Sequence, residues 1–199
     1  MDVLPVQTGR IQEIRAIDAD NDVDLDVAVA NQYASSALFA NAVPLLGPSL
    51  HIVGDPDARS VAWGDADTDG FLDLLAGGVL YSYDAGSGGF VSDTLSSMAQ
   101  TGAFGDFNGD GYLDVVLGTP TGCEVRPGPG WEPPIPLEDC GDARSFAWAD
   151  YDDDGVLDLA AALPTGASRR LKRSAPRQVR PAAATTRDPG PNGWQGPSP

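Results

Sequence analysis

Aspartates recur at alternate positions in four short segments of the sequence. Each segment has acids at positions 1 and 5, an acid or Asn at position 3, and a further acid at position 9. These positions are held by Asp18, Asp20, Asp22 and Asp26; by Asp65, Asp67, Asp69 and Asp73; by Asp106, Asn108, Asp110 and Asp114; and by Asp150, Asp152, Asp154 and Asp158. Six to eight oxygen ligands at about 2.3–2.6 Å suit Ca²⁺, whereas Mg²⁺ demands a stricter octahedron. The pattern therefore predicts four calcium loops.

The sixth position of each loop must allow a sharp turn. Gly70, Gly111 and Gly155 stand there in three loops, but the first loop has Val23. A β-branched residue is strained where φ is positive, so we expect the first site to be distorted or empty. The loops contain no Cys or His, which argues against Zn²⁺.

Two other interpretations of the loops are weaker. An EF-hand needs Glu at position 12, where this chain has Val29, Ala76, Leu117 and Ala161. Acidic turns without metal are the second alternative. Two observations argue against metal-free turns. The loop occurs four times at matched spacing, and each copy has three to five acids. These acids repel one another unless a cation neutralises them.

Short apolar runs flank the loops and would position them. They precede three loops at 61–63, 102–104 and 146–148, and follow them at 72–76, 113–117 and 157–161. Such runs, rich in aromatic and β-branched residues, predict buried strands. The loops begin 47, 41 and 44 residues apart, which leaves room for four short strands in each repeat, the size of a propeller blade.

Composition and charge narrow the class of protein. The 199 residues include 24 Gly and 17 Pro, which excludes a helical bundle, and no apolar run approaches the ~20 residues of a membrane span. A net charge of −17 disfavours nucleic acid as a partner. Residues 165–199 hold seven Lys or Arg and one Asp, so we predict a basic, Pro-rich, disordered tail after a body at 1–164.

The repeats resemble the FG-GAP/VCBS family of calcium-loop β-propeller repeats, as in the head of integrin α-subunits. The segments 61–70 and 105–114 carry the resemblance, which extends over roughly residues 11–163. It implies that each loop joins the first two strands of a blade and holds Ca²⁺. By the same resemblance, the backbone carbonyls of Asp24, Phe71, Tyr112 and Val156 would complete the ligand shells.

The fold we expect is all-β: a partial β-propeller of about four four-stranded blades. The repeats lie near 11–57, 58–99, 100–142 and 143–164, the last one incomplete. Propellers in the family close with about seven blades, and open sheet edges need cover. We therefore expect the remaining blades to come from a longer chain or a partner.

Cys123 and Cys140, the only cysteines, bracket the Pro-rich segment 127–136. We predict a disulfide, worth about 3 kcal/mol in the chain-entropy model; two free thiols are the alternative. A disulfide with calcium loops fits an extracellular, cell-surface or periplasmic location. No signal-peptide pattern precedes the first repeat, and we expect one to have been lost by truncation.

The leading functional hypothesis is a non-catalytic extracellular segment in which structural Ca²⁺ supports adhesion or binding of a protein or glycan. The body has one histidine, His51, and no Lys, so no nucleophilic triad can be assembled. The alternative is an accessory or catalytic portion of a secreted polysaccharide-acting enzyme, which would have to use Glu124, Glu132 or Glu138. A spacer resembling thrombospondin type 3 repeats is disfavoured by the wide loop spacing.

Three aromatic residues share one repeat position: Trp63, Phe104 and Trp148. We expect them to pack between blades. The alternative is a sugar-binding platform, which would require exposed rings.

Overall fold

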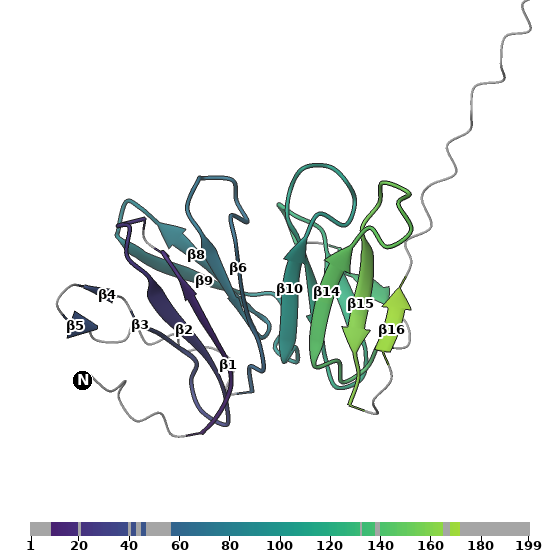
Figure 1. Cartoon of the computed structure of the whole chain (residues 1–199), viewed down its shortest axis with the longest axis horizontal. Helices are drawn as coiled ribbons and strands as arrows, with labels where there is room; N and C mark the ends of the chain where they lie inside the picture. Colours follow the sequence, from purple (N-terminus) through teal and green to yellow (C-terminus); the bar gives the residue numbers. More distant parts are fainter. Residues whose placement is uncertain are drawn as a thin grey trace, which may run out of the picture.

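The computed structural model describes residues 9–19, 21–39, 41–42, 45–46, 57–131, 133–137, 140–164 and 168–171. Within these ranges the chain is all-β, with four antiparallel sheets of three or four strands and one short two-stranded pair (Figure 1). No helix in the described ranges is long and apolar enough to cross a membrane. The predicted partial propeller is confirmed as a fold class.

Each sheet is built from strands that pair in sequence order. The first contains β1 (Arg10–Ile17), β2 (Asp26–Gln32) and β3 (Ala37–Phe39); the second contains β6 (Val61–Gly64), β7 (Asp73–Ala76), β8 (Val79–Asp84) and β9 (Gly89–Thr94). The third contains β10 (Thr101–Gly105), β11 (Asp114–Gly118), β12 (Cys123–Arg126) and β13 (Ile135–Leu137); the fourth contains β14 (Ser145–Ala149), β15 (Asp158–Ala162) and β16 (Ser168–Leu171). The short pair is β4 (Asn41–Ala42) and β5 (Leu45–Leu46).

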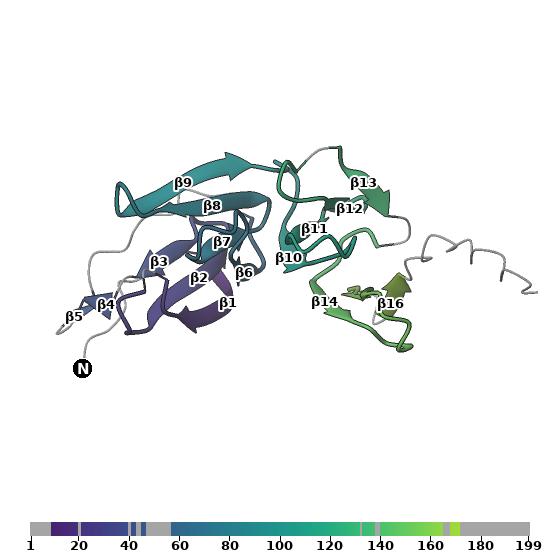
Figure 2. The same ribbon diagram turned by 90° about the horizontal axis from the view of Figure 1, so that it is seen from above.

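The sheets pack face to face through their second strands. Successive strand residues point to opposite faces, so a second strand can contact one neighbouring sheet on each side. In β7, Leu74 packs towards the first sheet, whereas the adjacent Leu75 packs with Val115 of β11. In β11, Val116 faces the other way and packs with Leu159 of β15. These strands are therefore buried on both faces, and fully burying a Leu or Val contributes about 1.5–3 kcal/mol. Figure 2 shows the four sheets from above.

The repeated aromatic position lies between the sheets, as expected. Phe104 packs into the cluster shared by the second and third sheets, and Trp148 into that shared by the third and fourth. The indole of Trp148 lies over Gly105, where an added Cβ would stand 2.6 Å from the ring. Only glycine allows this approach, so residue 105 fixes how closely the two sheets pack.

Two features of the sheets differ from the expectation. The first sheet has three strands, and the short β4–β5 pair follows it. In the fourth sheet, β16 pairs with β15 from Leu159↔Leu171 to Ala162↔Ser168, although the sequence placed the end of the body at residue 164. The basic composition suggested a tail, but ladder hydrogen bonds join backbone groups and do not depend on side-chain charge. Residues 172–199, His51, Glu132 and Glu138 lie outside the described residues.

Candidate metal loops

Each Asp loop joins the first two strands of its sheet and has the same backbone shape. The residues at positions 4 and 6 all have positive φ: Asn21 (61°) and Val23 (77°), Thr68 (64°) and Gly70 (91°), Gly109 (74°) and Gly111 (90°), Asp153 (55°) and Gly155 (81°). The strain expected at Val23 is therefore present. The turn at position 4 was missed, although Asn, Gly and Asp, which tolerate this conformation, stand there in three of the four loops.

The curled backbone directs amide N–H groups at the acids of positions 1 and 5. The position-1 carboxylate accepts the N–H of position 6 in every loop: Val23 to Asp18 (3.0 Å), Gly70 to Asp65 (3.1 Å), Gly111 to Asp106 (3.1 Å) and Gly155 to Asp150 (2.8 Å). The position-5 carboxylate accepts the N–H of position 7: Asp24 to Asp22, Phe71 to Asp69, Tyr112 to Asp110 and Val156 to Asp154. These bonds hold the acids in place around each loop.

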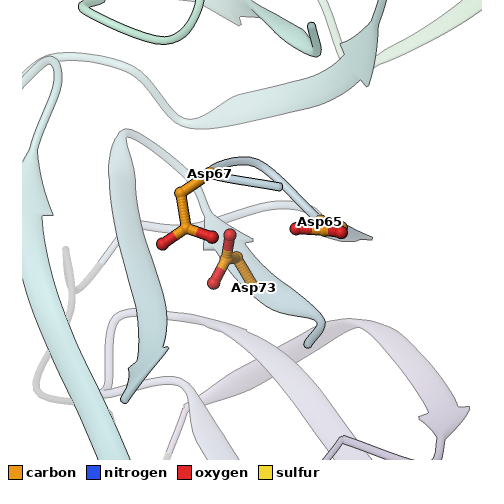
Figure 3. A group of neighbouring side chains, drawn as sticks. All are labelled: Asp65, Asp67 and Asp73. Carbon is orange, nitrogen blue, oxygen red and sulfur yellow. The ribbon is translucent and has the colours of Figure 1, made fainter. Parts of the chain in front are cut away.

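Two loops bring at least three carboxylates together. Asp65, Asp67 and Asp73 each offer an oxygen within 4.8 Å of the others, and so do Asp150, Asp152 and Asp154. In Figure 3 the carboxylates of Asp67 and Asp73 face one another beside Asp65. Both groups have the oxygen donors that a hard cation requires.

The other predicted ligands are not gathered into such a group of three carboxylates among the described residues. Asp20 of the first loop lies outside the described residues. In the third loop the side-chain amide of Asn108 donates to Asp110 at 2.8 Å. The position-9 acids Asp26, Asp114 and Asp158 are buried. The carbonyls of Asp24, Phe71, Tyr112 and Val156 stay predictions as ligands.

The second loop holds negative charge that its own hydrogen bonds do not fully compensate and that a cation would neutralise. The Oδ1 atom of Asp65 is buried and has no hydrogen-bond partner, and an unpaired buried carboxylate oxygen is costly. Desolvation, together with the charges of Asp69 and Asp65, raises the pKa of Asp67. The residues of this loop therefore fit a divalent cation, which would pair with the orphaned oxygen and screen the repulsion.

Neighbouring loops also meet at one end of the molecule. The strands β10 and β14 run in the same direction (Figure 1), so their loops lie at the same edge. A cavity of about 200 Å³ lies between them and is lined by Asp106, Asn108 and Val156 among others. The third and fourth loops thus line one shared pocket, in which Asp106 is the acidic residue.

The predicted disulfide between Cys123 and Cys140 is present, with the two Cα atoms 5.7 Å apart. Both cysteines are buried, and they pack with Ala143 and Ala161. The bond ties the start of β12 to the segment that enters the fourth sheet. It therefore closes the Pro-rich insert within the third repeat, beside the fourth sheet.

Comparison with protein families identifies one of these units. The model of the FG-GAP repeat matches residues 98–124, which contain β10, the third Asp loop, β11 and the start of β12. This segment is similar to the FG-GAP repeat. This match confirms the resemblance inferred from the sequence, and the other three loops repeat the same pattern around the FG-GAP unit. No curated protein matches the chain.

Proposed function

We propose that this chain is a calcium-binding, non-catalytic FG-GAP propeller segment whose metal ions are structural. The observation that carries the proposal is the buried, unpartnered Oδ1 of Asp65 beside Asp67 and Asp73. A bound Ca²⁺ would supply positive charge to these oxygens and join the ends of the first two strands. The same role would extend to the acids of the other loops.

We further propose that the segment works outside the cell and binds a protein or glycan partner. The FG-GAP match and the disulfide support this setting, because disulfides persist in oxidising compartments. The alternative as part of a polysaccharide-acting enzyme gains no support from Glu124, which forms an ion pair with Arg126 at 2.9 Å. The additional blades of a propeller would belong to a longer chain or a partner.

Calorimetric titration of the full chain with Ca²⁺ tests the metal. The expected result is saturable binding. Binding of Mg²⁺ should be weaker, because Ca²⁺ accepts six to eight oxygens in variable geometry whereas Mg²⁺ demands a near-ideal octahedron. The double variant Asp65→Asn/Asp67→Asn should bind fewer ions. Asp93→Asn, which neutralises an exposed acid on β9, should bind as the wild type does. The absence of saturable binding to the wild-type chain would overturn the proposal.

A further inference from the structure

The position-9 aspartates make the same backbone contact in all four repeats. One oxygen of each, Oδ2, accepts the N–H of the residue at position 2 of the same loop. The pairs are Ala19 to Asp26 (2.9 Å), Ala66 to Asp73 (2.8 Å), Phe107 to Asp114 (2.7 Å) and Tyr151 to Asp158 (3.3 Å). Each carboxylate therefore closes its loop from the end back to the beginning.

The other oxygen, Oδ1, reaches the chain at or just beyond the end of the third strand in three repeats. The Oδ1 atom of Asp26 accepts the N–H of Asn41 (2.8 Å). In the same way, Asp73 accepts the N–H of Tyr83 (3.0 Å), and Asp114 accepts the N–H of Gly128 (2.9 Å). The three donors occupy equivalent places. The residue that follows each Asp pairs in the ladder with Phe39, Tyr81 or Arg126. The donor lies two residues after that ladder partner. The side chain thus adds one hydrogen bond to the end of the ladder between the second and third strands.

These carboxylates are also the most buried acids of the loops. Asp73 and Asp114 are 0% exposed, Asp26 is 2% exposed and Asp158 is 5% exposed. By contrast, the described acids at positions 3 and 5 of the loops are exposed. Buried charge is tolerated where backbone N–H groups solvate it. The contacts join protein groups to one another.

We propose that the position-9 aspartates are structural ties whether or not metal is bound. Each one closes its own loop, and in three repeats it also fastens the loop to the end of the third strand. The inference deepens the proposed function, because such a tie would hold the acids of positions 1, 3 and 5 ready for Ca²⁺. It gives Asp26, Asp73, Asp114 and Asp158 a structural role in addition to their predicted role as ligands. Only the calcium arm of the test below depends on the proposed function.

Two isosteric variants of the third loop distinguish a structural tie, which acts without metal, from a residue that only binds Ca²⁺. Asp114→Asn replaces one accepting oxygen with an NH₂ group that faces a backbone N–H donor, and should lower the thermal midpoint by about 5 °C in EDTA. The shift that Ca²⁺ adds should fall as well, because Asp114 is also a predicted ligand. Asp110→Asn removes a repelling charge from the exposed rim, and should leave the EDTA midpoint unchanged or raised while reducing the calcium shift.

The opposite result for Asp114→Asn would overturn the inference: an unchanged or raised midpoint in EDTA, with loss of the calcium shift, would make Asp114 a ligand alone. If the wild-type chain shows no calcium shift, the proposed function fails, but the comparison in EDTA still decides the role of Asp114.

Hydrogen exchange on the unmodified chain gives a second readout that needs no variant. The amides of Ala66, Tyr83, Phe107 and Gly128 should exchange slowly in EDTA, because buried carboxylates accept them. Those of Gly70 and Phe71, which are bonded to the exposed rim of a loop, should be protected mainly after Ca²⁺ is added. Equal, fast exchange of both sets in EDTA would contradict a metal-independent tie.

Discussion

At the scale of single residues, each Asp loop requires left-handed backbone at two positions. Three loops place Gly at the second of these positions, whereas the first places Val23 there with φ of 77°. The side chain of Val23 is 91% exposed, so it gains almost nothing from burial in return for the strain. The residue type at this one position therefore weakens the first loop relative to the other three.

Replacing Val23 with Gly should stabilise the chain by about 1 kcal/mol, because the left-handed region costs a residue with a Cβ about 1–2 kcal/mol and glycine gives back part of this in unfolded-state entropy. Urea unfolding of the two proteins in EDTA measures the difference. The reverse change in the second loop, Gly70→Val, is the matched control and should destabilise by a similar amount. A Val23→Gly variant less stable than the wild type would refute strain at this position.

At the scale of elements, the blades are joined by polar contacts as well as by apolar faces. Arg59, just before β6, donates to Asp142 at 2.6 Å. The pair links the segment that enters the second sheet to the segment between the third and fourth sheets. The guanidinium of Arg59 lowers the pKa of Asp142. The contribution of this pair to stability is therefore present above the ordinary pKa of 3.8 and is lost as the pH falls through the lowered value.

Removing the Arg59–Asp142 pair should lower the free energy of unfolding by more than removing an exposed ion pair does. Arg59→Met should destabilise the chain by about 1 kcal/mol at pH 7, because the Arg59 side chain is only 12% exposed and Asp142 would lose its least exposed partner. Arg15→Met, which breaks the pair with Glu13 at a side chain 60% exposed, should change stability by less than about 0.5 kcal/mol. Equal effects of the two changes on the urea midpoint would show that Arg59 does not join the blades.

The sequence predicts these elements unevenly. The strands beside the loops follow from their apolar runs, and the loops from their alternating acids, because both patterns are local. The Arg59–Asp142 pair joins residues 83 positions apart, and no local pattern encodes it. The second role of Asp73 was hidden because one residue type serves both as a metal ligand and as an acceptor of backbone N–H groups. The strand β16 was missed because its pairing uses backbone groups within a basic segment.

At the scale of the whole molecule, an acidic chain carries its charge in loops at the ends of packed β-sheets. The net charge of −17 opposes the compact state through self-repulsion, and the loops concentrate that charge. Sheet packing, the disulfide and backbone hydrogen bonds to the acids act in the other direction. Calcium bound at the loops would relieve the repulsion where it is strongest.

A thermal melt of the full chain in Ca²⁺ and in excess EDTA tests this most directly. An ion that binds only the folded state stabilises it by about 2.7 kcal/mol per site at 100 times its dissociation constant. For a domain of this size, each kcal/mol raises the midpoint by about 2–4 °C. We therefore expect a midpoint at least ~5 °C higher in Ca²⁺, reduced in the Asp65→Asn/Asp67→Asn variant and retained in Asp93→Asn. A cooperative melt with the same midpoint in both buffers would contradict structural calcium.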